Sequence, residues 1–232
     1  MNQLELQNIS KNYKKKQVLE PLSLTANKGE CIVLSGGNGA GKSTLLSIIA
    51  GILAPSSGTV SLNGISLESH RRSYVEQIGY MPDDFLADPT MTVREFLLFY
   101  ASLRKINKKR VEEVLALVGL EEQRNYRITG LSKGMRQRLL FGQAWLGKPA
   151  LLLLDEPTNG LDPYWVNAFV QHIKAIKNSG TIVIFSTHMM DVAAETADRI
   201  LFMKAGKVME QLTELTSKEE VVMELLKLQR VV

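Results

Sequence analysis

The sequence has little of several features that mark particular classes of protein. Its one cysteine, Cys31, excludes an internal disulfide and favours a reducing compartment. The most apolar stretches, 47–54 and 150–154, are far shorter than the roughly 18 to 20 residues of a membrane helix. The first residues lack the basic and apolar regions of a signal peptide. We therefore expect a cytoplasmic chain that reaches a membrane only through another protein.

Internal repeats, low-complexity linkers and known nucleic-acid-binding motifs are also absent from the sequence. The formal charge is only +4, and the basic residues are scattered apart from clusters at 14–16, 71–72 and 104–110. These clusters are most simply interpreted as solvated surface. The alternative is contact with anionic lipid headgroups or an acidic partner. We expect no nucleic acid partner.

The composition is that of an ordinary globular protein, with 45% apolar and 22% charged residues among 232. Apolar periodicity divides the chain into strand-rich segments at about 1–82 and 148–216, and a helical segment at about 83–147. In the first segment we expect a single helix, at 42–50. Strands alternate with helices after 148, which predicts a parallel sheet. Asn63-Gly64 is a hairpin turn signal, and Ala205-Gly206 is expected to turn a terminal hairpin. A closing helix is expected at about 217–229, with Ser217 as its N-cap. The sequence thus predicts one α/β domain with a helical insertion.

The loop from Gly36 to Ser43 has the spacing G-x-x-x-x-G-K-[ST] of a phosphate-binding loop. It follows a short apolar strand, 31–34, and precedes the helix that starts at Lys42, whereas a plain glycine-rich turn would not require this context. Backbone N–H groups of such a loop surround phosphate oxygens, the lysine meets the β and γ phosphates, and the serine ligates Mg²⁺. The predicted nucleotide-binding residues here are Gly36, Gly37, Asn38, Gly39, Ala40, Gly41, Lys42, Ser43 and Thr44.

Two carboxylates, Asp155 and Glu156, follow the apolar run 151–154. Ligands of open parallel sheets bind at the carboxyl ends of the strands. We expect Asp155 to hold the Mg²⁺ shell and Glu156 to orient and deprotonate the attacking water. The alternative is that the two acids only end a core strand. His188 follows the predicted strand 181–187, so it could reach the same edge of the sheet.

Taken together, these motifs resemble the nucleotide-binding domain of an ABC transporter, and the resemblance extends from Leu4 to Glu210. The order of elements is its specific part. The run 131–135, Leu-Ser-Lys-Gly-Met, is similar to the LSGGQ signature and lies between the phosphate loop and Asp155-Glu156. The run 159–162 stands in the place of the D-loop, and His188 in that of the switch histidine.

The resemblance implies an α/β P-loop NTPase fold, with a RecA-like core, an antiparallel β subdomain and the helical insertion. It implies that ATP stacks on Tyr13 and that Lys42, Glu156 and His188 act in hydrolysis. It also implies a head-to-tail dimer, a homodimer as the simplest case, in which Ser132 and Gly134 face the nucleotide held by the other chain. The helical insertion would contact a separately encoded membrane permease, which would place the chain at the inner face of the membrane.

Three positions depart from the family pattern. Gly37 stands where proline is frequent, and Lys133 and Met135 replace glycine and glutamine of the signature. Asp83 occupies the usual position of a glutamine, and we expect it to ligate Mg²⁺ or water. Asp83 together with the run 132–138 is similar to bacterial drug, antibiotic or copper-maturation exporters whose membrane subunit is a separate chain.

Two other functions would require features of their own. A soluble ABC-type ATPase acting on ribosomes or nucleic acid would usually carry tandem domains, a long coiled coil or a metal module. A guanine-nucleotide switch would require an N-K-x-D motif. The sequence contains none of these features.

Overall fold

The computed structural model describes residues 3–14, 16–84, 87–213 and 217–230. Lys15 of the first basic cluster lies outside these ranges, as do the parts of the predicted segments at 85–86 and 214–216. Among the described residues, no helix combines the length and apolar character that crossing a bilayer requires.

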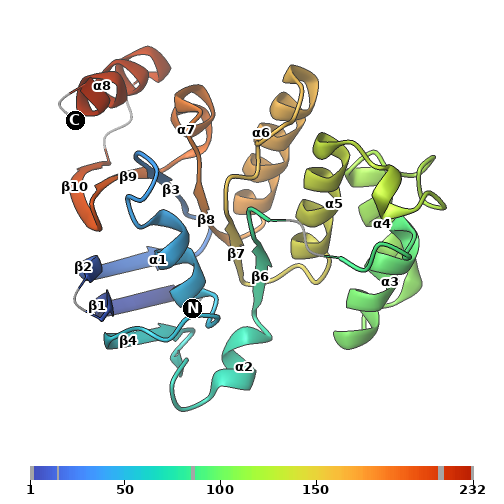
Figure 1. Ribbon diagram of the computed structural model, residues 1–232, viewed down its shortest axis with the longest axis horizontal. Helices are drawn as coiled ribbons and strands as arrows, with labels where there is room; N and C mark the ends of the chain where they lie inside the picture. Colours follow the sequence, from blue (N-terminus) through green and yellow to red (C-terminus); the bar gives the residue numbers. More distant parts are fainter. Residues whose placement is uncertain (1–2, 15, 85–86, 214–216, 231–232) are drawn as a thin grey trace.

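A six-stranded sheet forms the centre of the molecule, with the strand order β10-β9-β3-β8-β7-β6 (Figure 1). Its strands are β3 (Cys31–Ser35), β6 (Ile78–Met81), β7 (Leu151–Leu154), β8 (Ile182–Ser186), β9 (Arg199–Lys204) and β10 (Lys207–Leu212). All neighbours pair in parallel except β10, which pairs antiparallel with β9. The predicted parallel sheet and the hairpin at Ala205-Gly206 are thereby confirmed.

A smaller antiparallel sheet, in the order β2-β1-β4-β5, lies to one side of the central sheet (Figure 1). Its strands are β1 (Gln3–Tyr13), β2 (Lys16–Asn27), β4 (Ser57–Leu62) and β5 (Ile65–Ser66). Asn63 and Gly64 connect the last two strands with φ values of 56° and 76°. Positive φ at both turn positions is what an Asn-Gly hairpin turn requires, so this predicted turn is confirmed.

Three helices in the middle of the chain lie at the far end of the molecule from the antiparallel sheet (Figure 1). They are α3 (Val93–Leu103), α4 (Lys108–Leu117) and α5 (Lys133–Trp145), with the short 3-10 helix η1 (Ile128–Gly130) before α5. Thr92 and Glu95 form a capping box at the start of α3, and the Ser132 side chain caps α5. The described part of 83–147 contains no strand, as predicted.

The prediction of a single helix in the first segment was wrong. In addition to α1 (Lys42–Ile49), the structure contains the five-residue helix α2 (Arg71–Val75). Tyr74 is its buried residue, and the Tyr74 hydroxyl donates to the Ile49 carbonyl. One turn with one buried side chain is too short to produce helical periodicity in the sequence.

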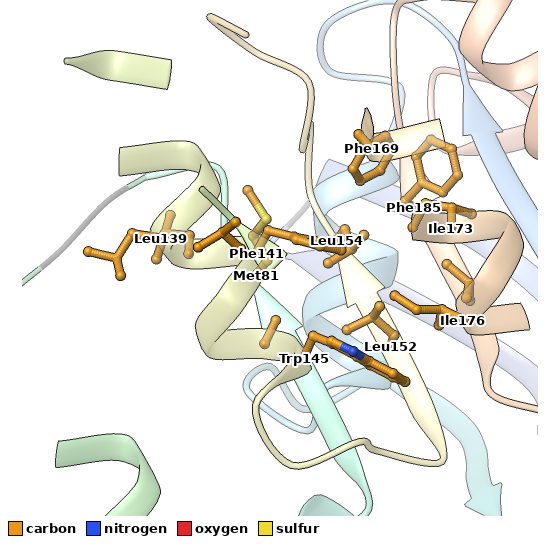
Figure 2. Close-up of a cluster of buried hydrophobic side chains, with 14 of the residues drawn as sticks. Met81, Leu139, Phe141, Trp145, Leu152, Leu154, Phe169, Ile173, Ile176 and Phe185 are labelled. Carbon is orange, nitrogen blue, oxygen red and sulfur yellow. The ribbon is translucent and has the colours of Figure 1, made fainter. Parts of the chain in front are cut away.

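The inner strands of the central sheet are buried on both faces because their alternate side chains enter different cores. Leu152 and Leu154 join one core, with the helical insertion and α6 (Pro163–Asn178). Leu151 and Leu153 join the other, with α1 and the antiparallel sheet. Figure 2 shows the first core, where Met81 and side chains of α5 meet β7. This period-two division explains why the strands read as continuous apolar runs.

The remaining helices are α7 (Met190–Thr196) and α8 (Lys218–Arg230), which lie near each other at the end opposite the helical insertion (Figure 1). Ser217 begins α8, where its hydroxyl accepts from the Glu220 N–H at 3.2 Å. The predicted closing helix and its N-cap are therefore confirmed.

Candidate active site

The glycine-rich loop connects β3 to α1 and is packed too tightly for side chains at two of its glycines. Gly36 has φ 143°, and a Cβ there would lie 2.1 Å from the Met203 carbonyl oxygen. Gly41, the N-cap of α1, has φ 100°, and a Cβ there would lie 3.1 Å from the Val18 carbonyl oxygen. A side chain at Gly37 would meet nothing within 4 Å. The sequence pattern thus has a steric cause at Gly36 and Gly41.

A cleft opens along this loop and continues to the ends of β7 and β8. It is lined by Val18, Asn38, Gly39, Ala40, Gly41, Lys42, Ser43, Thr44, Asp83, Glu156, Asn159 and His188. The structure therefore brings most of the residues predicted from separate motifs into one place. Val18, from β2, was not predicted, because a valine in a strand is typical of any sheet.

Glu156 lies between two basic side chains at the bottom of this cleft. Its Oε1 atom is 3.8 Å from Lys42 Nζ and 3.2 Å from His188 Nε2. Burial raises the pKa of Glu156, and the attraction of His188 and then of Lys42 opposes this effect. Burial likewise lowers the pKa of Lys42, against the attraction of Glu156 and Asp155. Two oppositely charged side chains are thus both held partly out of water.

The buried Oε1 atom of Glu156 accepts no hydrogen bond from the residues that the structure describes. Buried polar atoms are normally paired, so an unpaired carboxylate oxygen at the bottom of a cleft is suited to bind a polar molecule such as water. Lys42 Nζ, on the same side, donates to the carbonyls of Gly36 at 2.8 Å and Gly37 at 3.3 Å. The lysine ammonium is thereby held over the phosphate loop.

Ser186 links the two acids at the end of β7. Its hydroxyl donates to Asp155 Oδ1 at 2.6 Å and accepts from the Glu156 N–H at 2.8 Å. Asp155 and Ser186 are 3% and 0% exposed, so this contact is shielded from water. Sequence reasoning missed Ser186, although its place at the end of the strand before His188 was a usable signal.

Asp83 lies in the cleft, as predicted, and its Oδ1 atom accepts from Asn159 Nδ2 at 3.3 Å. The described residues contain no group of three His, Cys, Asp or Glu side chains suited to a metal. Mg²⁺ does not need such a group, because proteins usually bind it through one or two carboxylates together with substrate phosphates. Ser43, Asp83 and Asp155 are the oxygen donors near the loop that fit this mode.

Six predicted site residues are not among the residues that line the cleft. Gly36, Gly37 and Asp155 adjoin lining residues in the chain, whereas Tyr13, Ser132 and Gly134 lie apart from it. Tyr13, at the end of β1, is 49% exposed, and Lys11 Nζ lies 5.1 Å from its ring centroid. Ser132 and Gly134 are at the start of α5, where a Cβ on Gly134 would lie 2.7 Å from the Gly160 carbonyl oxygen. Their predicted contacts with nucleotide therefore stay predictions.

The fold and the cleft together define a P-loop nucleotide-binding ATPase. A family model described as ABC transporter matches residues 19–159. The chain is 35% identical to the linearmycin resistance ATP-binding protein LnrL of Bacillus subtilis, over 88% of this chain and 67% of the relative. It is also 35% identical to the Nod factor export ATP-binding protein I of Rhizobium etli, over 89% of this chain and 67% of that protein. The chain belongs to the ABC transporter ATP-binding family.

Solved structures agree with this assignment. An ATP-binding subunit of an ABC transporter superposes with a TM-score of 0.86 at 30% identity, covering 96% of this chain and 99% of the other. The ABC transporter cassette MJ0796, described as dimeric, has a TM-score of 0.84 at 27% identity, covering 90% and 98%. A further structure of that cassette is a post-hydrolysis state bound to ADP and Pi. The chain is thus an ATP-binding and ATP-hydrolysing subunit.

Proposed function

We propose that this chain uses ATP hydrolysis in the cleft at Lys42, Glu156 and His188 to power a separately encoded membrane permease, most simply an exporter. The observation that carries the proposal is the buried Oε1 atom of Glu156 beside the phosphate loop, which lies near Lys42 and His188 but accepts no hydrogen bond from the described residues. A carboxylate oxygen that accepts no protein hydrogen bond can accept a proton from the attacking water.

The side chains have distinct roles in this proposal. Lys42 binds the β and γ phosphates, and the loop N–H groups surround the remaining phosphate oxygens. Glu156 orients and deprotonates water, and His188, 3.2 Å from Glu156 Oε1, holds that carboxylate and contacts the terminal phosphate. Tyr13 stacks on the adenine base. Burial raises the pKa of Glu156, which makes its carboxylate a stronger base.

Magnesium is the expected cofactor, and Ser43, Asp155 and Asp83 are the residues that would hold it or its water. When bound, Mg²⁺ neutralises charge that develops on the phosphates. Ser186 orients Asp155 for this role through the 2.6 Å hydrogen bond.

Two chains are proposed to associate head to tail, so that Ser132 and Gly134 of one complete the nucleotide site of the other. Support comes from the dimeric cassette that this chain resembles and from the exposed position of Ser132 at the N-terminus of α5. The positive end of a helix favours a facing phosphate. A homodimer is the simplest arrangement.

We infer that residues 83–147 form a helical subdomain that contacts the permease, beside a core and β subdomain at 1–82 and 148–216. Leu103 and Phe99 on α3 are 65% and 46% exposed, which suits contact with another protein. Export is favoured because the names of similar proteins refer to Nod factor export and to linearmycin resistance. Such a partner would hold the chain at the cytoplasmic face of the membrane.

The test uses the Glu156→Gln protein, which should bind ATP but hydrolyse it only slowly. Addition of ATP and Mg²⁺ should convert monomer to dimer in sedimentation velocity, and ADP should not. The same protein, tagged and purified from membranes with ATP present, should retain an integral membrane protein. Absence of the ATP-dependent dimer at high protein concentration would contradict the head-to-tail arrangement. Purification without any membrane protein would contradict the permease.

A further inference from the structure

The backbone of Glu156 has a conformation that is unusual for its sequence. Its φ is 47°, in the left-handed region that residues with a side chain seldom occupy. Glu156 also precedes Pro157, and a residue before proline is ordinarily extended. Such strain persists only where surrounding groups hold the backbone, so the contacts of this peptide segment determine where the carboxylate points.

Both ends of the Glu156 backbone are held by side chains from other elements. The N–H donates to Ser186 Oγ on β8 at 2.8 Å. The carbonyl accepts from Gln137 Nε2 on α5 at 2.8 Å, and also from the Asn159 N–H in the following turn at 3.1 Å. Gln137 is therefore the side chain through which the helical insertion reaches the Glu156 backbone.

Gln137 can hold the Glu156 carbonyl in one position. It is 4% exposed, so water does not compete with its hydrogen bond. Further along α5, Phe141 and Trp145 pack in the same core as Leu152 and Leu154 of β7 (Figure 2). This packing fixes α5 against β7, the strand that leads to Glu156. It thereby also fixes the distance between the Gln137 amide and the Glu156 carbonyl.

We propose that Gln137 is a positioning residue for hydrolysis, which holds the left-handed backbone of Glu156 and so aims its carboxylate into the cleft between Lys42 and His188. The proposal rests on the proposed function of Glu156 as general base. Loss of the amide donor would let the Glu156 peptide relax toward ordinary dihedral angles, and the carboxylate would turn away from the attacking water. A displacement of about 1 Å at a reacting group can lower a rate by about 10²-fold.

The test compares Gln137→Met, which keeps the length of the side chain and removes the donor, with Gln143→Met further along the same helix. Gln143 is half-buried and serves as the matched control. We expect Gln137→Met to lower kcat by about tenfold or more, with the Kd for ATP within about twofold of wild type. Gln143→Met should leave kcat within about twofold. Equal losses in the two variants, or a change in Kd alone, would overturn the proposal.

A double-mutant cycle separates positioning from a general structural role. If Gln137 acts through Glu156, then Gln137→Met should not further slow single-turnover hydrolysis once Glu156→Gln is present, because residues acting as a unit are not additive. A further fall as large as in the wild-type background would refute the proposal. If Gln137→Met fails to fold, Gln137→Asn, whose amide is too short to reach the carbonyl, replaces it with the same expectations.

The cycle also distinguishes failure of this inference from failure of the proposed function. If Glu156→Gln alone hydrolyses ATP as fast as wild type, then Glu156 is not the general base and the proposed function fails. If Glu156→Gln is slow and Gln137→Met is as fast as wild type, then only the positioning role is refuted.

Discussion

The Nε2 atom of His188 lies 3.2 Å from Oε1 of Glu156, although the two residues follow different strands. Leu154 at the end of β7 is paired with Phe185 of β8, so the segments after these strands lie side by side. Lys42 Nζ approaches the same oxygen to 3.8 Å from the phosphate loop. Glu156 is thus where the three motifs meet, and changes to it should alter turnover more than ATP binding.

Replacing Glu156 with glutamine should lower the rate of ATP turnover by about 10² to 10⁴, the usual loss when a general base is removed. The amide keeps the shape of the side chain but cannot accept the proton of water. Steady-state phosphate release measures the rate, and the Kd for ATP should stay close to wild type. The exposed Glu122→Gln is the control for the same change of charge. Turnover within a few-fold of wild type in Glu156→Gln would rule out the base.

The same substitution should stabilise the nucleotide-free protein in a pH-dependent manner. Burial raises the pKa of Glu156 above its ordinary value of 4.5, so the folded state disfavours the ionised form. Below about pH 4.5 the carboxyl is neutral in both states and the variant should gain nothing. As pH rises through the raised pKa, ionisation destabilises wild type alone, and the Tm difference should grow and then level off. A Tm difference that shrinks between pH 5 and 8 would contradict the sign of this shift.

Replacing Lys42 with alanine should abolish tight ATP binding, because the ammonium that meets the β and γ phosphates is lost. Its removal also leaves the buried carboxylate of Glu156 without its lysine neighbour at 3.8 Å. Calorimetry with ATP and Mg²⁺ measures the affinity, and Lys109→Ala on the exposed side of α4 controls for loss of one positive charge. An unchanged Kd in Lys42→Ala would argue against the phosphate loop as the site.

Much of the fold could be predicted because its elements have strong local patterns. The runs at 31–34 and 151–154 are wholly apolar, which indicates strands buried on both faces. Asn63-Gly64 and the Ser217 cap mark their turn and helix start by residue type alone. The helix α2 was missed because five residues contain less than two turns of periodicity. The shortness of α2, rather than its composition, prevented its prediction.

The site was predictable only where residues follow each other closely in the sequence. The phosphate loop and Asp155-Glu156 are contiguous motifs, and the structure brings them together. Ser186 and Gln137 were missed because their contacts join residues 31 and 19 positions apart and end partly on backbone atoms. A hydrogen bond from a side chain to a backbone carbonyl does not depend on the type of the residue that carries the carbonyl. No sequence pattern therefore marks the contact of Gln137, and for Ser186 the only signal is its place at the end of the strand before His188.

Ser132 should have two separable roles, which two substitutions can distinguish. Its hydroxyl accepts from the Met135 N–H at 3.2 Å and so caps α5. Ser132→Ala should lose about 1 kcal/mol of stability, or about 2 to 4 °C in Tm for a domain of this size. Ser132→Asp keeps a good cap, because aspartate is among the preferred N-cap residues, but places a negative charge where the partner's γ-phosphate is expected.

In the Glu156→Gln background, Ser132→Asp should therefore keep the Tm of its parent and yet lose the ATP-dependent dimer in sedimentation velocity. Ser132→Ala should lose part of both, because it removes the cap and one hydrogen bond to phosphate without adding repulsion. Thermal unfolding without nucleotide, where no dimer is expected, isolates the capping effect. If Ser132→Asp dimerises with ATP as readily as the parent, then Ser132 does not face the partner's phosphate, and its role is limited to the helix cap.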